Sequence, residues 1–513
     1  MRHICARFAG ALLALALWCQ EARPAEKPPM TSEPTSTEAT RLALAIAPHA
    51  AAHPGKTGIY ALPDPRDAFA ARAALAAAAD RTLDVQYYIW HGDETGTLLL
   101  EALWRAAERG VRVRLLLDDS GTAGLDATLA AIDAHPNIEV RLYNPMFHRW
   151  FPPINYLTDF RRVNRRMHNK SFTADGQAAI VGGRNVGNEY FGAGSGTVFA
   201  DLDVVATGAV VRDVSAAFDR FWNSPSAYPA ARLVKPAPPD AARSLEARFQ
   251  QMRAAPASEA YLAAVRDSAT VRDLLAGKLP LEWTRALLLC DDPAKTLDTT
   301  GRKDVLLLTA MLQAVGHPET SFDLISPYLV PGESGTAALT ALAGRGVKVR
   351  ILTNSLAATD VSVVHAGYAK RRGDLLDGGV RLFELERAAL QARTAQLPWL
   401  SGGSHASLHA KTFALDGSRI FVGSFNFDER SALLNTEMGL LIDSPALAGR
   451  LSAVFDRGFP GTAYEVRRAP EGGLEWLDRS PSGERRLTTE PGTGFLKRAW
   501  VRFLSILPIE WML

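Results

Sequence analysis

Two stretches of the chain, residues 168–185 (HNKSFTADGQAAIVGGRN) and 409–426 (HAKTFALDGSRIFVGSFN), carry the same polar pattern. In both, a lysine follows the histidine by two residues, an aspartate by seven and an asparagine by seventeen. A spacing of two places histidine and lysine on one face of a strand, and the following Asp-Gly pair is typical of a tight turn. Each stretch therefore predicts a β-hairpin that returns a glycine-rich corner and an asparagine beside the histidine and lysine.

The side chains that these hairpins gather suit a phosphate group. Each has an imidazole and an ammonium, from His168 and Lys170 or from His409 and Lys411, and its glycines let backbone N–H groups approach an anion. Two copies related by symmetry would set two imidazoles on opposite sides of one phosphorus. One histidine could then attack phosphorus, the other could act as general acid and base, and the lysines could neutralise the phosphate oxygens.

The similarity between the two halves extends well beyond the hairpins. Three further pairs of segments match in the same order: VRVRLLLD at 111 with VKVRILTN at 347, VRLY at 140 with VRLF at 380, and SAAFDR at 215 with SAVFDR at 452. Buried strand patterns alternate with helical ones, which is typical of α/β folds. We therefore expect an α/β fold of two homologous sandwich domains, related by a pseudo-twofold and sharing one active site.

Changes in composition predict the boundaries along the chain. A proline-rich run, Lys235–Pro239, separates the first half from a helical stretch rich in Ala, Arg and Glu. The expected segments are a leader (1–25), a flexible lead-in (26–45), domain 1 (46–234), a linker with a helical insertion (235–283), domain 2 (284–467) and a C-terminal tail (468–513).

The leader has the features of a secretory signal or signal anchor. Arg2, His3 and Arg7 precede an apolar run, Ala9–Trp18. A run of about ten residues is too short to span a bilayer. We expect a protein at the bacterial inner membrane, peripheral or held by its leader, on the periplasmic face.

Composition limits the other partners. The 57 basic residues nearly balance 55 acidic ones among 513, so net charge gives no argument for nucleic acid. Of three cysteines, Cys5 and Cys19 lie in the leader, which leaves neither a disulfide framework nor a thiolate metal site. We expect no metal, no cofactor and no nucleic-acid partner, and the sequence identifies no protein partner.

The C-terminal tail contains a basic amphipathic segment from Phe495 to Leu507. Its three cations lie within one arc, and Trp500 and Phe503 lie among the apolar residues outside it. Such a helix suits an anionic membrane surface, although it could instead dock onto the protein's own core. The arginine run from Arg161 to Arg166 is either a solvated surface or a second contact with anionic lipid.

Acids downstream of each motif could orient the histidines. Asp203 follows the first motif and Glu437 the second, each on a predicted strand. A carboxylate on the second ring nitrogen would fix the tautomer of an imidazole. Asp175 and Asp416 could be turn formers or catalytic supports. Gly183 stands where the second half has a serine, so the halves should have unequal roles.

The paired motifs resemble the H-x-K-x4-D-x6-G-G/S-x-N signature of the phospholipase D superfamily. MHNKSFTADG, VGGRNVGNEYFGAG, DLDVVATGAVVRDV and the C-terminal LPIEWML are similar to the bacterial cardiolipin synthase C family, over most of the chain beyond residue 45. The resemblance implies transfer of a phosphatidyl group to phosphatidylglycerol through a phosphohistidine, with phosphatidylethanolamine as donor and with attack from the first motif. It implies as catalytic residues His168, Lys170, Asp175, His409, Lys411 and Asp416, and as substrate-binding residues Asn185, Ser424 and Asn426.

Two other functions use the same chemistry. In a phospholipase D, water replaces the lipid acceptor. In a phosphodiester nuclease the substrate is nucleic acid, but superfamily nucleases are often dimers with one motif per chain. This chain has both motifs, a leader and an amphipathic tail, which favours a phospholipid substrate.

Overall fold

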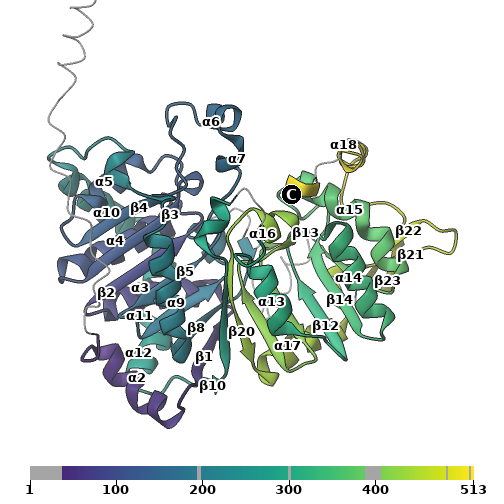
Figure 1. Cartoon of the computed structure of the whole chain (residues 1–513), viewed down its shortest axis with the longest axis horizontal. Coiled ribbons are helices and arrows are strands. Elements are labelled where there is room, and N and C mark those ends of the chain that lie inside the picture. Colours follow the sequence, from purple (N-terminus) through teal and green to yellow (C-terminus); the bar gives the residue numbers. More distant parts are fainter. Residues whose placement is uncertain are drawn as a thin grey trace, which may run out of the picture. The chain divides into compact units, whose positions relative to one another are not determined.

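The computed structural model describes residues 37–192, 198–298, 302–386, 406–480, 483–507 and 510–512. Thr35–Leu513 forms one compact unit built around two large sheets (Figure 1). The predicted leader lies outside the described residues. Helix α2 (Arg41–Ala52) begins inside the expected flexible lead-in, because Thr40 caps it and Arg41 pairs with Asp80.

The first sheet has nine strands in the order β10-β1-β8-β6-β5-β2-β3-β4-β9. Strands β2, β3 and β4 are parallel and the other pairs are antiparallel. The strands are β1 (Thr57–Leu62), β2 (Thr82–Tyr87), β3 (Arg112–Asp118), β4 (Ile138–Tyr143), β5 (Ser171–Ala174), β6 (Ala178–Gly182), β8 (Asp203–Gly208), β9 (Ala227–Pro229) and β10 (Glu282–Thr284).

The second sheet repeats the eight-strand order from β1 to β9 as β11-β20-β18-β17-β12-β14-β15-β21, and it adds β22 and β23 at one edge, whereas the first sheet adds β10 beside β1. The predicted repeat of two α/β halves is confirmed by this matching topology. The strands are β11 (Ala286–Cys290), β12 (Ser321–Ile325), β14 (Lys348–Asn354), β15 (Arg381–Leu385), β17 (Lys411–Leu415), β18 (Arg419–Gly423), β20 (Met438–Asp443), β21 (Ala463–Arg468), β22 (Leu474–Ser480) and β23 (Gly483–Leu487).

Helices cover the two sheets (Figure 1). Those used below are α3 (Pro65–Ala78), α4 (Glu94–Glu108), α6 (Pro153–Thr158), α7 (Phe160–Val163), α9 (Ala209–Trp222), α10 (Ala241–Ala254), α11 (Glu259–Asp267), α12 (Ala269–Leu275), α13 (Leu307–Val315), α15 (Ser362–Asp377), α16 (Glu429–Leu433), α17 (Pro445–Arg457) and α18 (Phe495–Ser505). Asp64 caps α3, with Pro65 as the first residue of that helix, whereas Asp292-Pro293 starts only a short 3-10 turn.

A buried arginine is repeated in both halves. Arg114 on β3 bonds Asp84 at 2.6 Å and reaches Asp219 of the SAAFDR segment on α9. In the second half Arg350 on β14 bonds Asp323 at 2.6 Å and reaches the corresponding aspartate of the SAVFDR segment on α17. The matched sequence segments thus fix the same helix on the same strand twice.

One of the buried apolar clusters is shared by the two halves. Val181 and Val204 of the first sheet belong to the same buried apolar cluster as Val422 and Leu440 of the second, together with side chains of α9 and α17. Burial of such side chains contributes about 1.5–3 kcal/mol each. The two hairpins are therefore held in a fixed relation to each other.

Two boundaries differ from the sequence expectation. The insertion packs onto the first half, where Phe249 of α10 and Tyr261 of α11 are buried, and β10 pairs with β1. The expected tail begins instead with β22 and β23, which extend the second sheet. Among the residues that the structure describes, no helix combines the length and apolar character needed to cross a membrane.

Candidate active site

The aspartates of the two motifs lie at the turns of the hairpins β5–β6 and β17–β18. Both have φ of +51°, the left-handed conformation that Asp tolerates in turns. The Asp175 carboxylate accepts the N–H groups of Arg81 at 2.8 Å and Thr82 at 2.9 Å. Asp416 accepts those of Thr320 at 2.7 Å and Ser321 at 3.0 Å. Their observed contacts are therefore structural, and a four- or five-residue strand separates each from its histidine.

Each histidine meets a carboxylate from the other half. His168 Nδ1 lies 2.8 Å from Glu437 Oε2, and His409 Nδ1 lies 2.6 Å from Asp201 Oδ2. Short backbone pairings between the halves place each histidine beside the carboxylate of the other half. Strand β16 (Ala406–Leu408) runs parallel to β7 (Val198–Ala200), and Met167 forms a bridge with Thr436. The histidine follows the paired residue in one half, and the carboxylate follows the paired residue in the other half. Each pairing therefore sets a histidine beside a carboxylate.

Asp203, which the sequence suggested as the support of a histidine, lies elsewhere. Its Oδ2 is 2.8 Å from Arg72 and 3.3 Å from Arg184, and all three side chains are buried. The strand register in the two sheets identifies Asp201 as the equivalent residue instead. Gly182 pairs with Asp203 and Gly423 with Gly439, so the counterpart of Glu437, two residues before Gly439, is Asp201.

The Gly183 and Ser424 difference follows from these carboxylates. A Cβ at Gly183 would lie 2.2 Å from Asp201 Oδ1, so only glycine leaves room for that carboxylate. In the other half the Ser424 hydroxyl donates to Glu437 and accepts the N–H of Met438 at 3.0 Å. Ser424 was expected to bind substrate, but its hydroxyl is occupied by this network.

The two asparagines also differ. Asn185 Oδ1 accepts the N–H of Ile89 at 3.2 Å, and its Nδ2 donates to the Tyr190 hydroxyl at 3.1 Å. Asn426 is buried, and its Oδ1 has no hydrogen-bond partner among the described residues. Of the two, Asn426 has the acceptor that a substrate hydroxyl could meet.

The two lysines are buried beside the histidines. Lys170 Nζ lies 2.5 Å from His168 O, and Lys411 Nζ lies 2.5 Å from His409 O. Burial lowers the pKa of Lys411 to about 8, and it lowers the pKa of Lys170 well below the usual lysine value. Two buried ammonium groups are poorly solvated. An anion that binds close to both would therefore be stabilised strongly.

Both imidazoles are neutral at pH 7. Burial and the charges of Lys170 and Lys411 hold the pKa of His168 well below its usual range. Burial and Lys411 lower the pKa of His409 to about 4, against the opposing effect of Asp201. A neutral imidazole that donates from Nδ1 to a carboxylate leaves a lone pair on Nε2, which can attack phosphorus or accept a proton.

The supporting carboxylates are electrostatically unequal. Burial alone would raise the pKa of Asp201, but His409 and Lys411 outweigh it and lower that pKa to about 2. For Glu437 burial dominates and raises the pKa to about 7. Asp201 therefore remains charged beside His409, whereas Glu437 titrates near neutral pH.

Aromatic rings hold the imidazoles. Tyr88 meets His168 edge-on at 4.9 Å between centroids. Tyr190 meets His409 edge-on at 5.1 Å, and Phe199 stacks on it at 5.0 Å. These contacts restrict rotation of the two imidazole rings.

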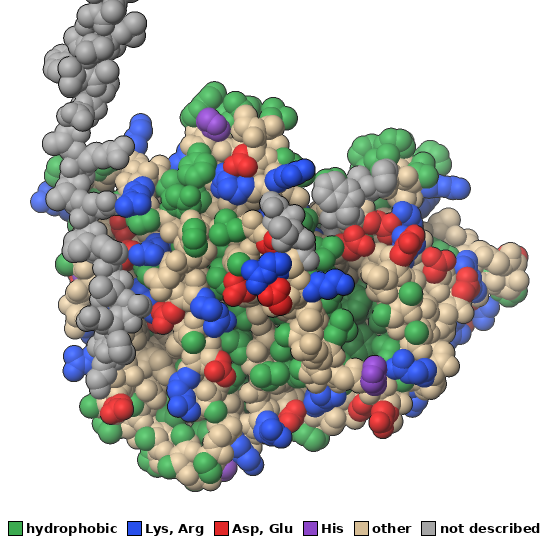
Figure 2. Space-filling model, viewed as in Figure 1, with side chains coloured by type: hydrophobic (Ala, Val, Ile, Leu, Met, Phe, Trp, Pro, Cys, Tyr) green, Lys and Arg blue, Asp and Glu red, His purple; other side chains and the backbone are tan. Residues whose placement is uncertain are grey.

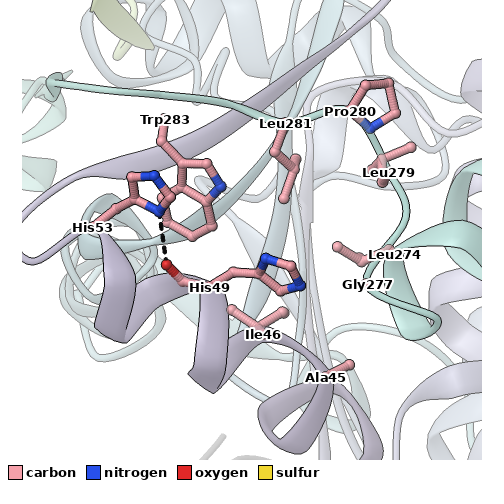
Figure 3. A pocket seen from close by; sticks show the side chains of 10 residues that line it. All are labelled: Ala45, Ile46, His49, His53, Leu274, Gly277, Leu279, Pro280, Leu281 and Trp283. Atoms are coloured by element: carbon pink, nitrogen blue, oxygen red, sulfur yellow. Dashed lines mark hydrogen bonds between the residues drawn. The ribbon is translucent and has the colours of Figure 1, made fainter.

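A cluster of titratable side chains and an apolar hollow lie apart from the paired motifs. His91, Asp93 and Glu189 have ligand atoms within 4.8 Å of one another, but Asp93 already caps α4 and Glu189 lies 3.1 Å from His91 Nδ1. A separate hollow between α2, α12 and β10 is lined by apolar residues and by His49 and His53, and His53 stacks on Trp283 at 4.9 Å (Figure 3). Neither contains a residue of the paired motifs.

The comparisons with known proteins agree with this geometry. The family model "Cardiolipin synthase, PLD-like domain" matches residues 72–222 and 311–458. The Escherichia coli protein "Cardiolipin synthase C" is 48% identical over 92% of this chain and all of that protein. A Staphylococcus aureus "Cardiolipin synthase" is 25% identical, over 72% of this chain and 60% of its own length.

One solved structure shares the fold at low sequence identity. A crystal structure of phosphatidylserine synthase from Haemophilus influenzae aligns with 92% of this chain and 100% of that chain, with a TM-score of 0.56 and 14% identity. The family model matches a segment in each half of the chain, and the Escherichia coli relative covers most of both. The chain belongs to the cardiolipin synthase family of phospholipase D-like proteins.

Proposed function

We propose that this protein is a cardiolipin synthase, which transfers a phosphatidyl group to phosphatidylglycerol through a phosphohistidine. The observation that carries the proposal is the buried set of two imidazoles, each oriented by a carboxylate from the other half, with a buried lysine beside each histidine. The 48% identity to the Escherichia coli protein named Cardiolipin synthase C indicates the lipid reaction.

The first step forms a covalent intermediate. His168, donating its Nδ1 proton to Glu437, attacks phosphorus with the Nε2 lone pair. The bond from phosphorus to the headgroup oxygen breaks, and that oxygen takes a proton from Nε2 of His409, which is neutral before substrate binds and takes up this proton from solvent when the anionic phosphate binds beside it. The charged Asp201 stabilises the His409 imidazolium, whereas Glu437 loses its charge near neutral pH. This difference in charge between the two supporting carboxylates favours His168 as nucleophile and His409 as general acid.

The second step releases cardiolipin. A phosphatidylglycerol hydroxyl loses its proton to His409 and attacks the phosphorus, and the bond from phosphorus to His168 breaks. Lys170 and Lys411 offset the charge of the phosphate oxygens in both steps. Asp175 and Asp416 act as positioning residues, because they hold the backbone before β2 and β12.

The test uses purified protein with defined lipids and mass spectrometry of the products. Cardiolipin should form from phosphatidylglycerol, with phosphatidylethanolamine as a candidate donor. His168→Ala and His409→Ala should each lower turnover by about a thousandfold or more, because the two groups act as a unit. Phosphatidic acid as the sole product would instead indicate a hydrolase. A phosphoryl label trapped at alkaline pH on the peptide that contains His409 would reverse the two roles.

We also propose that α18 lies on an anionic membrane surface. Val501 packs against Leu356 and Ala366, so one side of the helix docks on the protein. The opposite side exposes Phe495, Leu496, Trp500, Phe503 and Ile506. Exposed aromatic and aliphatic side chains flanked by cations suit an interface between lipid and water, and this arrangement supports a location at the inner membrane.

Charge and burial should both contribute to this contact. Trp500→Ser/Phe503→Ser should weaken binding to all vesicles. Changing Arg498 and Arg502 to Gln should weaken binding chiefly to anionic vesicles, and less at high salt. Equal binding by the wild type and both variants would refute a role for α18. The periplasmic face can be tested by protease protection in intact and opened cells.

A further inference from the structure

A second apolar protrusion rises from the first half between β4 and β5. It contains α6 and α7 and exposes six large apolar side chains between residues 147 and 160. The most exposed are Leu157 at 85% and Trp150 at 80%. Figure 2 shows these apolar side chains gathered at the edge where Figure 1 places α6 and α7, with a second group over α18.

The protrusion is held firmly at its base. Arg149 bonds Asp119 at 2.7 Å and also pairs with Asp126. The Asn155 amide closes the loop onto His148 O at 3.1 Å and accepts its N–H at 3.0 Å. Ion pairs and hydrogen bonds therefore fix the loop that exposes the apolar side chains. A monomeric soluble protein seldom exposes such a cluster without a partner.

One arginine connects this protrusion to the C-terminal end of the chain. Arg430 of α16 lies 2.9 Å from Asn164 Oδ1, just after α7, and 3.0 Å from Met512 O, beyond α18. A few residues after α16, the N–H of Thr436 bonds Arg166 O at 2.9 Å, and Thr436 precedes the carboxylate of Glu437. The protrusion and the C-terminal end of the chain that follows α18 thus both adjoin the segment that orients His168.

The charge of the protrusion favours an anionic lipid surface over an acidic or mixed protein surface. Residues 147–158 include the exposed His148 and contain no acid, and the charge of Arg149 is offset at the base of the protrusion by Asp119 and Asp126. Asp159, which follows, pairs with Arg162, and Arg161 is exposed. Aromatic residues with neighbouring cations are suited to the headgroup region of a bilayer.

We propose that the α6–α7 protrusion inserts into the headgroup region of an anionic bilayer, as a second contact beside α18, and that the two contacts seat the histidine pair over the lipid phosphates. The proposal rests on the proposed reaction with membrane lipids. The proposal adds a membrane contact in the first half to the contact made by α18, so that each half of the enzyme would contribute one contact.

The test compares two surface variants of the full-length protein on vesicles of phosphatidylglycerol and phosphatidylcholine in equal parts. Trp150→Ser/Leu157→Ser removes the two most exposed side chains of the protrusion. The matched control is Leu44→Ser/Leu312→Ser, on α2 and α13, where the exposed fractions are 65% and 63%. We expect co-sedimentation to weaken about tenfold or more in the first variant and to change less than about twofold in the control.

A second measurement reports depth. Brominated acyl chains should quench part of the wild-type fluorescence, and Trp150→Phe should keep binding while losing part of that quenching. Unchanged binding by Trp150→Ser/Leu157→Ser, with an unchanged melting temperature, would overturn the inference even if cardiolipin is made. A lipid-free particle mass that falls in this variant would indicate an interface between two copies and also overturn it. Failure of the wild type to make cardiolipin would refute the proposed function without affecting the binding comparison.

Discussion

Asp201 and Asp203 are two residues apart, and the structure predicts opposite consequences for losing each charge. Asp201 Oδ2 lies 2.6 Å from His409 Nδ1. In Asp201→Asn the amide can donate to Nδ1, which would favour the tautomer with a proton on Nε2 and block its use as a base. Loss of a carboxylate that fixes a catalytic imidazole costs roughly 10³–10⁴ in kcat, or about 4–5.5 kcal/mol.

Asp203→Asn should instead affect stability. The Asp203 carboxylate compensates two buried guanidinium groups, those of Arg72 at 2.8 Å and Arg184 at 3.3 Å. Removing one partner from a buried ion pair costs about 3–5 kcal/mol. The free energy of unfolding should therefore fall, while the folded fraction keeps kcat within about tenfold of wild type, because Asp203 touches neither histidine.

The assay measures initial rates of cardiolipin formation by mass spectrometry, beside denaturant unfolding of each variant under the same conditions. Activity is divided by the folded fraction before comparison. An Asp201→Asn enzyme within tenfold of wild type would refute the assignment of that carboxylate to His409. A fully stable Asp203→Asn protein that has lost kcat would show that Asp203 supports the chemistry after all.

Three other predictions follow from the site. Gly183→Ser should lower kcat by at least about tenfold with little change in fold, because its Cβ would lie 2.2 Å from Asp201 Oδ1; wild-type rates would show that the carboxylate can move without cost. The kcat/KM profile should rise through about pH 7, as Glu437 ionises and accepts the Nδ1 proton, and fall through about pH 8, as Lys411 loses its proton; a flat profile across this range would contradict both assignments. Asp416→Asn should lower the free energy of unfolding by about 1–3 kcal/mol through its lost backbone contacts, measured by urea titration, and a kcat loss without destabilisation would assign it a catalytic role.

The sequence alone was sufficient for features that depend on local pattern. The spacing of His168 and Lys170, and of His409 and Lys411, sets each pair on one strand, because side chains alternate along a strand. The Asp-Gly pairs at 175 and 416 predicted turns, which the positive φ angles match. The collinear repeat predicted two α/β halves, because similar sequences fold into similar units.

Only the tertiary structure decided which carboxylate serves which histidine. Asp201 and His409 are 208 residues apart, and His168 and Glu437 are 269 apart. No spacing within one motif encodes such contacts, since they depend on backbone pairing between the halves. Asp201 and Asp203 are equally acidic in the sequence. The pairing sets Asp201 beside an imidazole and leaves Asp203 among buried arginines, and the same packing makes Gly183 a requirement for space rather than a missing hydroxyl.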